Sequence, residues 1–284
     1  MSRNISEAYV VLIKRTFNTR FVLSRLTRVP LLKSLIGRAF FEGDDIMILP
    51  RDGTVSRTID IDLEVDPGED LVVPSDIIWE TVRRFDGGAI MNFCICRESN
   101  SCDDYPRELG CLFLGPGAER ISPSLARQVD VVEALEHVDR CQEAGLVHLI
   151  GRNKIDSLWL NTGPKEDLLT ICNCCPCCCL WKMIPNLDND LGRSITSMPG
   201  VSVSVSDACR GCGICSKDVC FVNAVTISDG RASIDQERCR GCGRCVEVCP
   251  HDAIRLLVTG DPMAESLARL GPLVSPKDRP SSKP

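Results

Sequence analysis

The chain has 284 residues, which is long enough for two domains. Its formal net charge of −6 disfavours general nucleic-acid binding, so we expect no nucleic-acid partner. Its 19 cysteines would suit a secreted disulfide scaffold only in a much smaller chain with a signal peptide. We find neither feature, nor an apolar run of about twenty residues that could span a membrane. We therefore expect a reduced, cytoplasmic protein of an anaerobic setting.

Basic residues dominate the beginning of the chain. Residues 1–41 hold eight Arg or Lys and a single acidic residue, Glu7. Apolar residues recur at helical spacing from Val10 to Phe21 and again after Pro30, which predicts two amphipathic helices. Such helices can dock on an anionic membrane surface or an acidic partner. They can equally pack on the chain's own domain with their arginines in solvent.

The hydrophobic pattern then changes to a period of two. Apolar and acidic residues alternate towards the end of 46–65, which predicts a β-hairpin turning at Asp52 and Gly53. A helix is predicted from Pro74 until the glycine pair that begins at Gly87.

The first cysteines follow a short apolar run. Residues 89–96 predict a buried strand that carries Cys94 and Cys96 at its end. Cys102 and Cys111 then fall on the loop beyond.

A second helical pattern lies in the middle of the chain. Residues 128–144 predict the clearest helix, and Cys141 continues its apolar face, which indicates a core residue and not a ligand. Residues 146–150 and 157–160 predict two strands after it.

A dense run of cysteines follows. Six thiols within eight residues exceed what packing requires, and a single iron–sulfur cube offers only four irons. We expect some of them to bind a metal together with cysteines from the earlier segment. The predicted metal ligands are Cys94, Cys96, Cys102, Cys172, Cys174, Cys175, Cys177 and Cys178.

Three interpretations of these thiols stay open: a third iron–sulfur cluster, a structural zinc or other metal, and reactive thiols. Adjacent cysteines also mark the non-cubane clusters of heterodisulfide reductase subunits. Those carry a Cys-Cys-Gly signature, whereas this chain has Cys-Cys-Pro at Pro176.

The cysteine-rich part resembles a domain that precedes ferredoxin modules in uncharacterised iron–sulfur proteins of anaerobes. The resemblance rests on the CxCR motif that begins at Cys94 and on the later NCCxCCC run, and it covers residues 44–180. It implies an iron–sulfur protein without naming a reaction.

Beyond a proline- and glycine-containing stretch, a cysteine pattern repeats itself. The two halves read Cys209-Arg-Gly-Cys212-Gly-Ile-Cys215 with Cys220, and Cys239-Arg-Gly-Cys242-Gly-Arg-Cys245 with Cys249. Each CxxCxxC run can bind three corners of an iron–sulfur cube, and a more distant cysteine supplies the fourth. Zinc sites also use CxxC pairs, but they need only four ligands. Eight cysteines therefore predict two [4Fe–4S] clusters.

This repeat resembles the bacterial two-cluster ferredoxins over residues 201–258. The resemblance implies that the fourth ligand of each cluster comes from the other half. It groups Cys209, Cys212, Cys215 and Cys249 around one cluster, and Cys239, Cys242, Cys245 and Cys220 around the other. The first half departs from the family pattern, with one extra residue before Cys220 and with Phe221 where the family has proline.

The predicted fold class is α+β, a cysteine-rich α+β domain followed by a ferredoxin-like two-cluster domain. The predicted segments are a basic helical segment at 1–42, the cysteine-rich domain at 43–180, a linker at 181–200, the ferredoxin domain at 201–260 and a disordered tail at 261–284. Strands are expected at 201–205, 225–227, 232–234 and 254–257, with the first pairing with the others.

The function predicted from these features is electron transfer between a redox protein donor and acceptor. One alternative is a redox enzyme subunit whose N-terminal thiol site reduces a substrate with electrons from the ferredoxin clusters. Another is a redox-responsive interaction protein. We identify no catalytic residue, because paired carboxylates, a nucleophile elbow, a phosphate-binding loop and a dinucleotide fingerprint are all missing from the sequence.

Overall fold

The computed structural model describes residues 3–57 and 73–274. It contains both helices and sheets, which confirms the predicted α+β class. None of the helices in these residues is long and apolar enough to cross a membrane.

The strands are β1 (Asp45–Ile48), β2 (Val55–Arg57), β3 (Gly88–Met91), β4 (Leu112–Leu114), β5 (Ala126–Val129), β6 (Val147–Arg152), β7 (Leu169–Cys174), β8 (Ile195–Ser197), β9 (Val201–Val205), β10 (Val225–Ser228), β11 (Arg231–Ile234) and β12 (Ile254–Val258). The α-helices are α1 (Arg3–Thr16), α2 (Arg20–Leu26), α3 (Pro30–Ile36), α4 (Pro74–Arg83), α5 (Ile95–Ser99), α6 (Val131–Glu143), α7 (Lys154–Leu160), α8 (Asn189–Gly192), α9 (Arg244–Glu247) and α10 (Pro262–Leu270). Shorter helical turns are η1 (Phe17–Thr19), η2 (Gly37–Phe41), η3 (Asp52–Thr54), η4 (Ala118–Arg120), η5 (Lys165–Asp167), η6 (Leu180–Asn186) and η7 (Ile214–Ser216).

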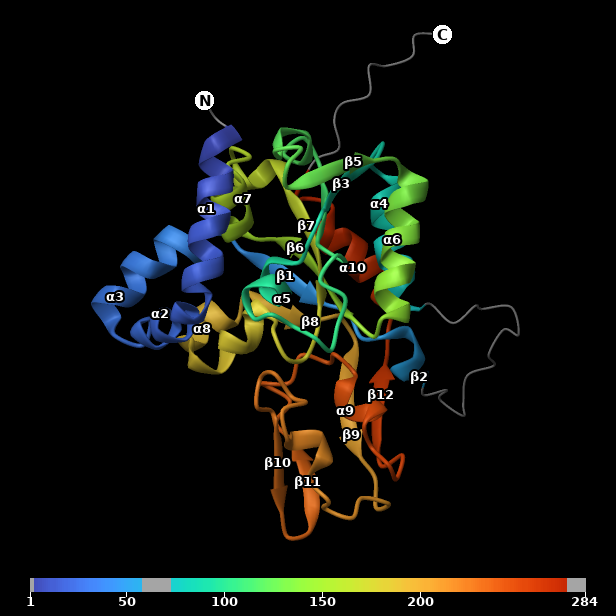
Figure 1. Cartoon of the computed structure of the whole chain (residues 1–284). Coiled ribbons are helices and arrows are strands. Elements are labelled where there is room, and N and C mark those ends of the chain that lie inside the picture. The colour runs from blue at the N-terminus through green and yellow to red at the C-terminus, as the bar shows by residue number, and fades with distance from the viewer. Residues whose placement is uncertain (1–2, 58–72, 275–284) are drawn as a thin grey trace.

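A seven-stranded sheet forms the larger body, which we call the sheet domain. Its order is β5-β3-β4-β7-β6-β1-β8, and neighbours run antiparallel except for the parallel pair β1 and β8. Helices α4, α6 and α10 cover one face and share a core with it. Helices α1 and α7 and the turns η2 and η6 cover the other face (Figure 1).

The period of two along β7 decides where its cysteines point. Leu169 and Ile171 lie in the core under α4, α6 and α10. Cys172 and Cys174 pack on the opposite face, against the core that includes Trp181. Successive strand residues alternate between the faces of a sheet, so both thiols are directed to the same side.

The hairpin predicted in 46–65 is wrong. Strand β1 pairs with β6 and β8, whereas β2 pairs in parallel with β12 far along the chain. The turn η3 at Asp52 separates the two strands and sends them into different sheets. The alternating residues 59–65 that suggested the hairpin lie outside the described residues.

Two further strand predictions need correction. The strand expected over 89–96 ends at Met91, and Cys94 instead precedes α5, which contains Cys96. Residues 157–160 form the end of α7, because the Asn153 side chain caps that helix by accepting a hydrogen bond from the Ile155 amide at 3.1 Å. A run of four residues with three apolar side chains fits either period, so the cap decides the structure. The helix predicted over 128–144 is confirmed as α6, but it begins at Val131, because residues 128–129 end β5.

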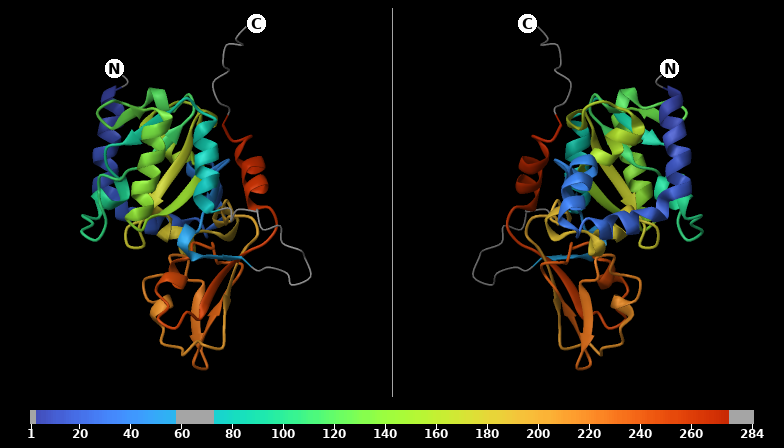
Figure 2. Two further views of the ribbon diagram at one scale, coloured as in Figure 1. Left: turned by 90° about the vertical axis from the view of Figure 1, so that its right-hand side faces the viewer. Right: turned by 90° about the vertical axis from the view of Figure 1, so that its left-hand side faces the viewer.

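The predicted linker and tail also contain packed structure. Within 181–200 lie most of η6 and all of α8 and β8, and Trp181 is only 1% exposed. The tail predicted as disordered from residue 261 holds α10, whose Leu270 is buried against the sheet domain. Figure 2 shows α10 (red) lying along the sheet domain. Proline content misled both predictions, because long-range packing orders residues 181–200 and 262–274. Residues 275–284 of the predicted tail lie outside the described residues.

Residues 201–260, which we call the C-terminal module, contain the four predicted strands. Strand β9 pairs with β12, and β10 and β11 form a separate hairpin, so the expected pairing of β9 with all three is only partly correct. Strand β2 adds a parallel edge beside β12. The two bodies are therefore interlocked: β2 enters the C-terminal module, and α10 returns from it to the sheet domain (Figure 1).

The basic N-terminal helices pack on the sheet domain. Val10 and Phe17 are buried, Lys14 forms an ion pair with Glu98 at 3.3 Å, and Arg28 donates to the Pro185 carbonyl at 2.6 Å. Several basic side chains thus have partners within the chain. The outer faces of these helices nevertheless leave large apolar side chains exposed, among them Leu31 at 82%.

A buried carboxyl group at the start of the sheet domain, that of Asp44, should make the stability of the fold depend on pH. Burial raises the pKa of Asp44 from 3.8 to about 7, although its Oδ1 accepts a hydrogen bond from the Lys154 amide at 2.7 Å. A raised pKa in the folded state means that Asp44 stabilises the fold below pH 4 and loses this contribution as pH rises through 7. Asp44→Asn keeps the acceptor oxygen without the ionisation. Its stability relative to the wild type should therefore increase between pH 5 and pH 8 by about 2–3 kcal/mol.

Urea denaturation of both proteins across this pH range, without oxygen, measures the difference. Changes in metal binding with pH affect both chains alike and cancel. Parallel curves for the two proteins would show that Asp44 does not titrate in this range.

Candidate metal centres

The C-terminal module presents its cysteines from two loops of the same design. Gly211 and Gly241, with φ of 63° and 58°, occupy the left-handed region that L residues rarely adopt. This turn brings the Gly241 amide to 3.4 Å from the Cys239 sulfur. In the first loop, hydrogen bonds from the amides of Ala232 and Gly211 lower the pKa of Cys209. Both loops therefore direct backbone donors at sulfur atoms, and hydrogen bonds of this kind tune the potential of a bound cluster.

The structure gathers one of the two sets implied by the ferredoxin resemblance around a single cavity. One cavity, with an empty volume of about 310 Å³, is lined by set I: Cys209, Cys212, Cys215 and Cys249. The second predicted set, Cys239, Cys242, Cys245 and Cys220, is called set II. Burial, followed by the charges of the other three set II thiols and of Cys215, raises the pKa of Cys245. Cys220, Cys239 and Cys242 also pack against one apolar core.

The two distal cysteines sit in equivalent turns despite the extra residue. The Ala253 amide donates to the Cys249 sulfur at 3.3 Å, and the Ala224 amide donates to the Cys220 sulfur at 3.2 Å. The inserted residue lies between Cys215 and Cys220, where Asp218 adopts φ of 57°. A local left-handed residue therefore absorbs the insertion and keeps Cys220 in place.

The two sets differ in their surroundings. Cys212 of set I is exposed. Cys239 and Cys242 of set II pack against the sheet-domain core that contains Trp181. Burial raises the pKa of Cys242 to about 11, so without metal this thiol is neutral and metal binding must displace its proton.

Four thiols of the sheet domain form a compact site. It joins Cys102, on the loop after α5, to Cys175, Cys177 and Cys178, which follow β7, and all four sulfurs lie within 4.8 Å of one another. Cys177 is 3.5 Å from each of the other three sulfurs. The Cys178 amide also donates to the Cys175 sulfur at 3.4 Å.

These separations match a single metal ion. Zinc–sulfur bonds of about 2.3 Å in a tetrahedron place the sulfurs about 3.8 Å apart. Among the described residues no other group of three or more Cys, His, Asp or Glu ligand atoms is this close, and that includes the ferredoxin-type sets. The compact site is therefore smaller than the cluster sites of the same chain.

Six other thiols surround a separate, enclosed cavity that we call the thiol cavity. Its empty volume is about 480 Å³, and Cys175 of the compact site also lines it. The six cysteines are Cys94, Cys96, Cys111, Cys172, Cys174 and Cys179.

The eight predicted ligands thus divide between two places. Cys94, Cys96, Cys172 and Cys174 line the thiol cavity, and the other four make up the compact site. Cys111 and Cys179 were missing from the predicted set. Cys179 belongs to the dense run and could have been included from sequence, whereas Cys111 is placed by the pairing of β4 with β7, which no local pattern reveals.

The remaining cysteine of the sheet domain, Cys141, is buried in α6. Burial raises its pKa to about 12, and its sulfur lies 3.6 Å from His137 Nε2. It lines neither thiol site, in agreement with its prediction as a core residue.

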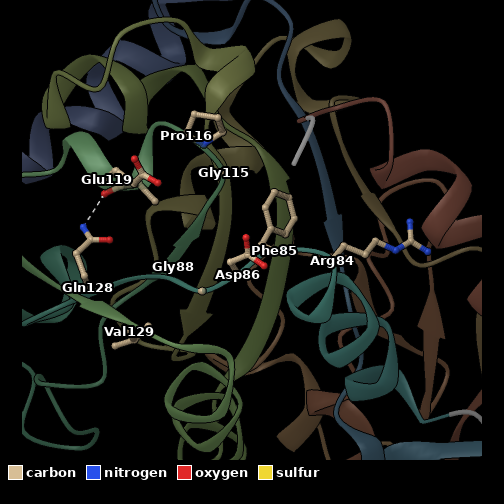
Figure 3. A pocket seen from close by; sticks show the side chains of 11 residues that line it. Arg84, Phe85, Asp86, Gly88, Gly115, Pro116, Glu119, Gln128 and Val129 are labelled. Atoms are coloured by element: carbon tan, nitrogen blue, oxygen red, sulfur yellow. Dashed lines mark hydrogen bonds between the residues drawn. The ribbon is translucent and has the colours of Figure 1, made fainter. Parts of the chain in front are cut away.

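A further pocket lies on the surface between β3, β5 and η4 (Figure 3). Gln128 donates to the Ala118 carbonyl across it at 3.0 Å. None of its 11 lining residues is a cysteine, so this pocket is unrelated to the metal chemistry.

Comparison with known families supports the C-terminal assignment. Residues 232–255 match the family described as 4Fe-4S binding domain. The matched range contains the second CxxCxxC run and Cys249. Comparisons with curated proteins and with solved structures find no match. The chain therefore carries a C-terminal ferredoxin-type domain that supports at least one [4Fe–4S] cluster and an iron–sulfur electron-transfer role.

Proposed function

We propose that this protein transfers electrons through two [4Fe–4S] clusters and holds a further metal in its sheet domain. The crosswise grouping of sets I and II on duplicated loops carries the proposal. Set I would hold cluster I, and set II would hold cluster II. Four thiolates per cluster give the low potentials typical of bacterial ferredoxins, and amide donors to sulfur tune them.

The surroundings of the clusters suggest a direction for the electron path. The exposed Cys212 makes cluster I the one nearer to solvent, where a redox protein partner can approach. Cys239 and Cys242 place cluster II against the sheet domain. Electrons would therefore enter or leave the module at cluster I and reach the sheet domain through cluster II.

The compact site supports a structural metal ion. Three of its four cysteines, Cys102, Cys175 and Cys178, are buried, and a closed set of four thiolates leaves no position for a substrate. A metal there would tie the loop after α5 to the turn after β7. Zinc fits the spacing, and a single iron with four thiolates has the same tetrahedral shape.

A second candidate function is that of an oxidoreductase subunit. An apolar cavity with an empty volume of about 1120 Å³ lies under α1 and α2 and shares Ile95, Asp156, Trp159 and Leu180 with the thiol cavity. A small apolar substrate could bind beside the thiols. Residues of α1 and α2 would then line the substrate cavity. The exposed face of residues 1–41 would in addition contact a membrane surface or an acidic partner.

Two double variants test the crosswise ligation. Cys209→Ala with Cys249→Ala removes two ligands of cluster I only, so the protein should lose about four irons and keep cluster II. Cys209→Ala with Cys220→Ala removes one ligand from each cluster, so both clusters should be lost. Iron and sulfide analysis with electron paramagnetic resonance of the dithionite-reduced proteins measures both outcomes. The reverse pattern would show that each half binds its own cluster.

A single variant tests the compact site. Cys177→Ala removes the sulfur that lies 3.5 Å from the other three, so one metal ion per chain should be lost while cluster iron stays constant. Elemental analysis of protein purified without oxygen measures zinc and iron together. Cys141→Ala serves as the control, because Cys141 packs in the same core as Cys102, Cys175 and Cys178 but lines neither site. A loss of about four irons would instead indicate a cubane at this site.

A further inference from the structure

The thiol cavity has more sulfur than packing or the compact site explains. We propose that it holds a third iron–sulfur cluster, distinct from the metal of the compact site, and that cluster II exchanges single electrons with it. The placement of the cluster rests on the cavity itself, and only the exchange rests on the proposed function. In each exchange one cluster is oxidised as the other is reduced, and no bond or proton is transferred.

Three separate segments supply the thiols. The beginning of α5 provides Cys94 and Cys96, and the residue before β4 provides Cys111. Strand β7 and the turn after it provide the rest. Cys111 lies 3.7 Å from Cys172, and Cys174 lies 3.1 Å from Cys179, sulfur to sulfur. Thiols gathered from distant segments around an enclosed space are typical of a wrapped cluster.

The volume of the thiol cavity can be compared with that of the set I cavity in the C-terminal module. The set I cavity, which matches the ligand pattern of a cubane, has an empty volume of about 310 Å³. The thiol cavity has about 480 Å³, measured in the same way. The compact site, in contrast, has its four sulfurs within 4.8 Å of one another and suits one ion. The thiol cavity is therefore at least as large as the cavity of set I.

A buried positive charge at the thiol cavity independently supports a cluster there. Arg97 lines the cavity and is 0% exposed. Its guanidinium donates to the carbonyls of Asn173, at 2.8 Å, and Leu109, and its Nε has no partner in the described structure. Within residues 3–57 and 73–274, no carboxylate forms an ion pair with Arg97.

A buried cation without a counter-charge is strongly destabilising. Asp156 also lines the cavity, but its carboxylate accepts hydrogen bonds from Trp159, at 3.0 Å, and Asn153, at 3.1 Å. Thiolates that bind iron would bring negative charge to the cavity that Arg97 lines. A cluster at this position therefore explains why an arginine is buried here.

Arg244 links the cavity to cluster II. It precedes Cys245 of set II, and its guanidinium donates to the carbonyl of Cys174. Cys239 and Cys242 of set II also pack in the same apolar core as Cys172, Cys174 and Cys179 of the cavity. Cluster II thus adjoins the cavity and can serve as its electron donor or acceptor.

The test uses the full chain, purified without oxygen. Cys111→Ala with Cys179→Ala removes two cavity thiols that belong to neither set I, set II nor the compact site. We expect the variant to lose about four irons relative to Cys141→Ala, with the reduced resonance signals of clusters I and II retained. If wild type and variant both hold about eight irons, the third cluster is refuted while the proposed function stands. Fewer than eight in both proteins would refute the proposed function instead.

A second measurement covers the case in which the variant fails to fold. Wild-type protein is alkylated before and after its iron is removed by a chelator, and the labelled cysteines are identified by mass spectrometry. The six cavity thiols should be protected before removal and labelled afterwards, whereas Cys141 should stay protected by burial. Labelling of Cys111 and Cys179 in the iron-loaded chain, or a disulfide between Cys174 and Cys179, would overturn the proposal.

Discussion

The alternation of side chains along β7 is the constraint on which the thiol sites depend. It directs Cys172 and Cys174 to the face that α5, η6 and α7 cover, and it places Asn173 on the other face, where its side chain contacts His148 at 2.8 Å. The strand then ends, and the following turn carries the next cysteines away from the sheet. One dense run of thiols is thereby divided between two neighbouring sites, the compact site and the thiol cavity.

The interlocked chain gives the C-terminal module a defined position. Strand β2 completes its sheet, Arg51 pairs with Glu247 of α9, and α10 packs back on α4. Electron transfer between centres depends on their staying close, so a module attached by a flexible linker would suit a mobile carrier better. The observed attachment instead suits a fixed path from an exposed cluster towards the sheet domain.

The sequence predicted the features that depend on residues close together in the chain. The CxxCxxC runs, their repeat and the distal cysteines follow from ligand geometry, and the four cysteines of set I line one cavity. Helix α6 was predicted because its apolar period is local, but the Asp130 cap that starts it at Val131 was not recognised. The division of the sheet-domain thiols could not be predicted, because Cys111 reaches the cavity only through the pairing of β4 with β7. Helix α10 packs on α4, nearly two hundred residues earlier, but its Asp261 cap and the proline at its first position are local signals that the prediction overlooked.

We propose three iron–sulfur clusters along one electron path through this chain and a separate structural metal at the compact site. X-ray diffraction from crystals grown without oxygen, recorded on both sides of the iron absorption edge, locates iron directly. The account predicts cluster-sized anomalous density at set I, at set II and in the thiol cavity, and a single metal atom between Cys102, Cys175, Cys177 and Cys178. Density at sets I and II alone, with the thiol cavity empty or closed by a disulfide, would contradict it.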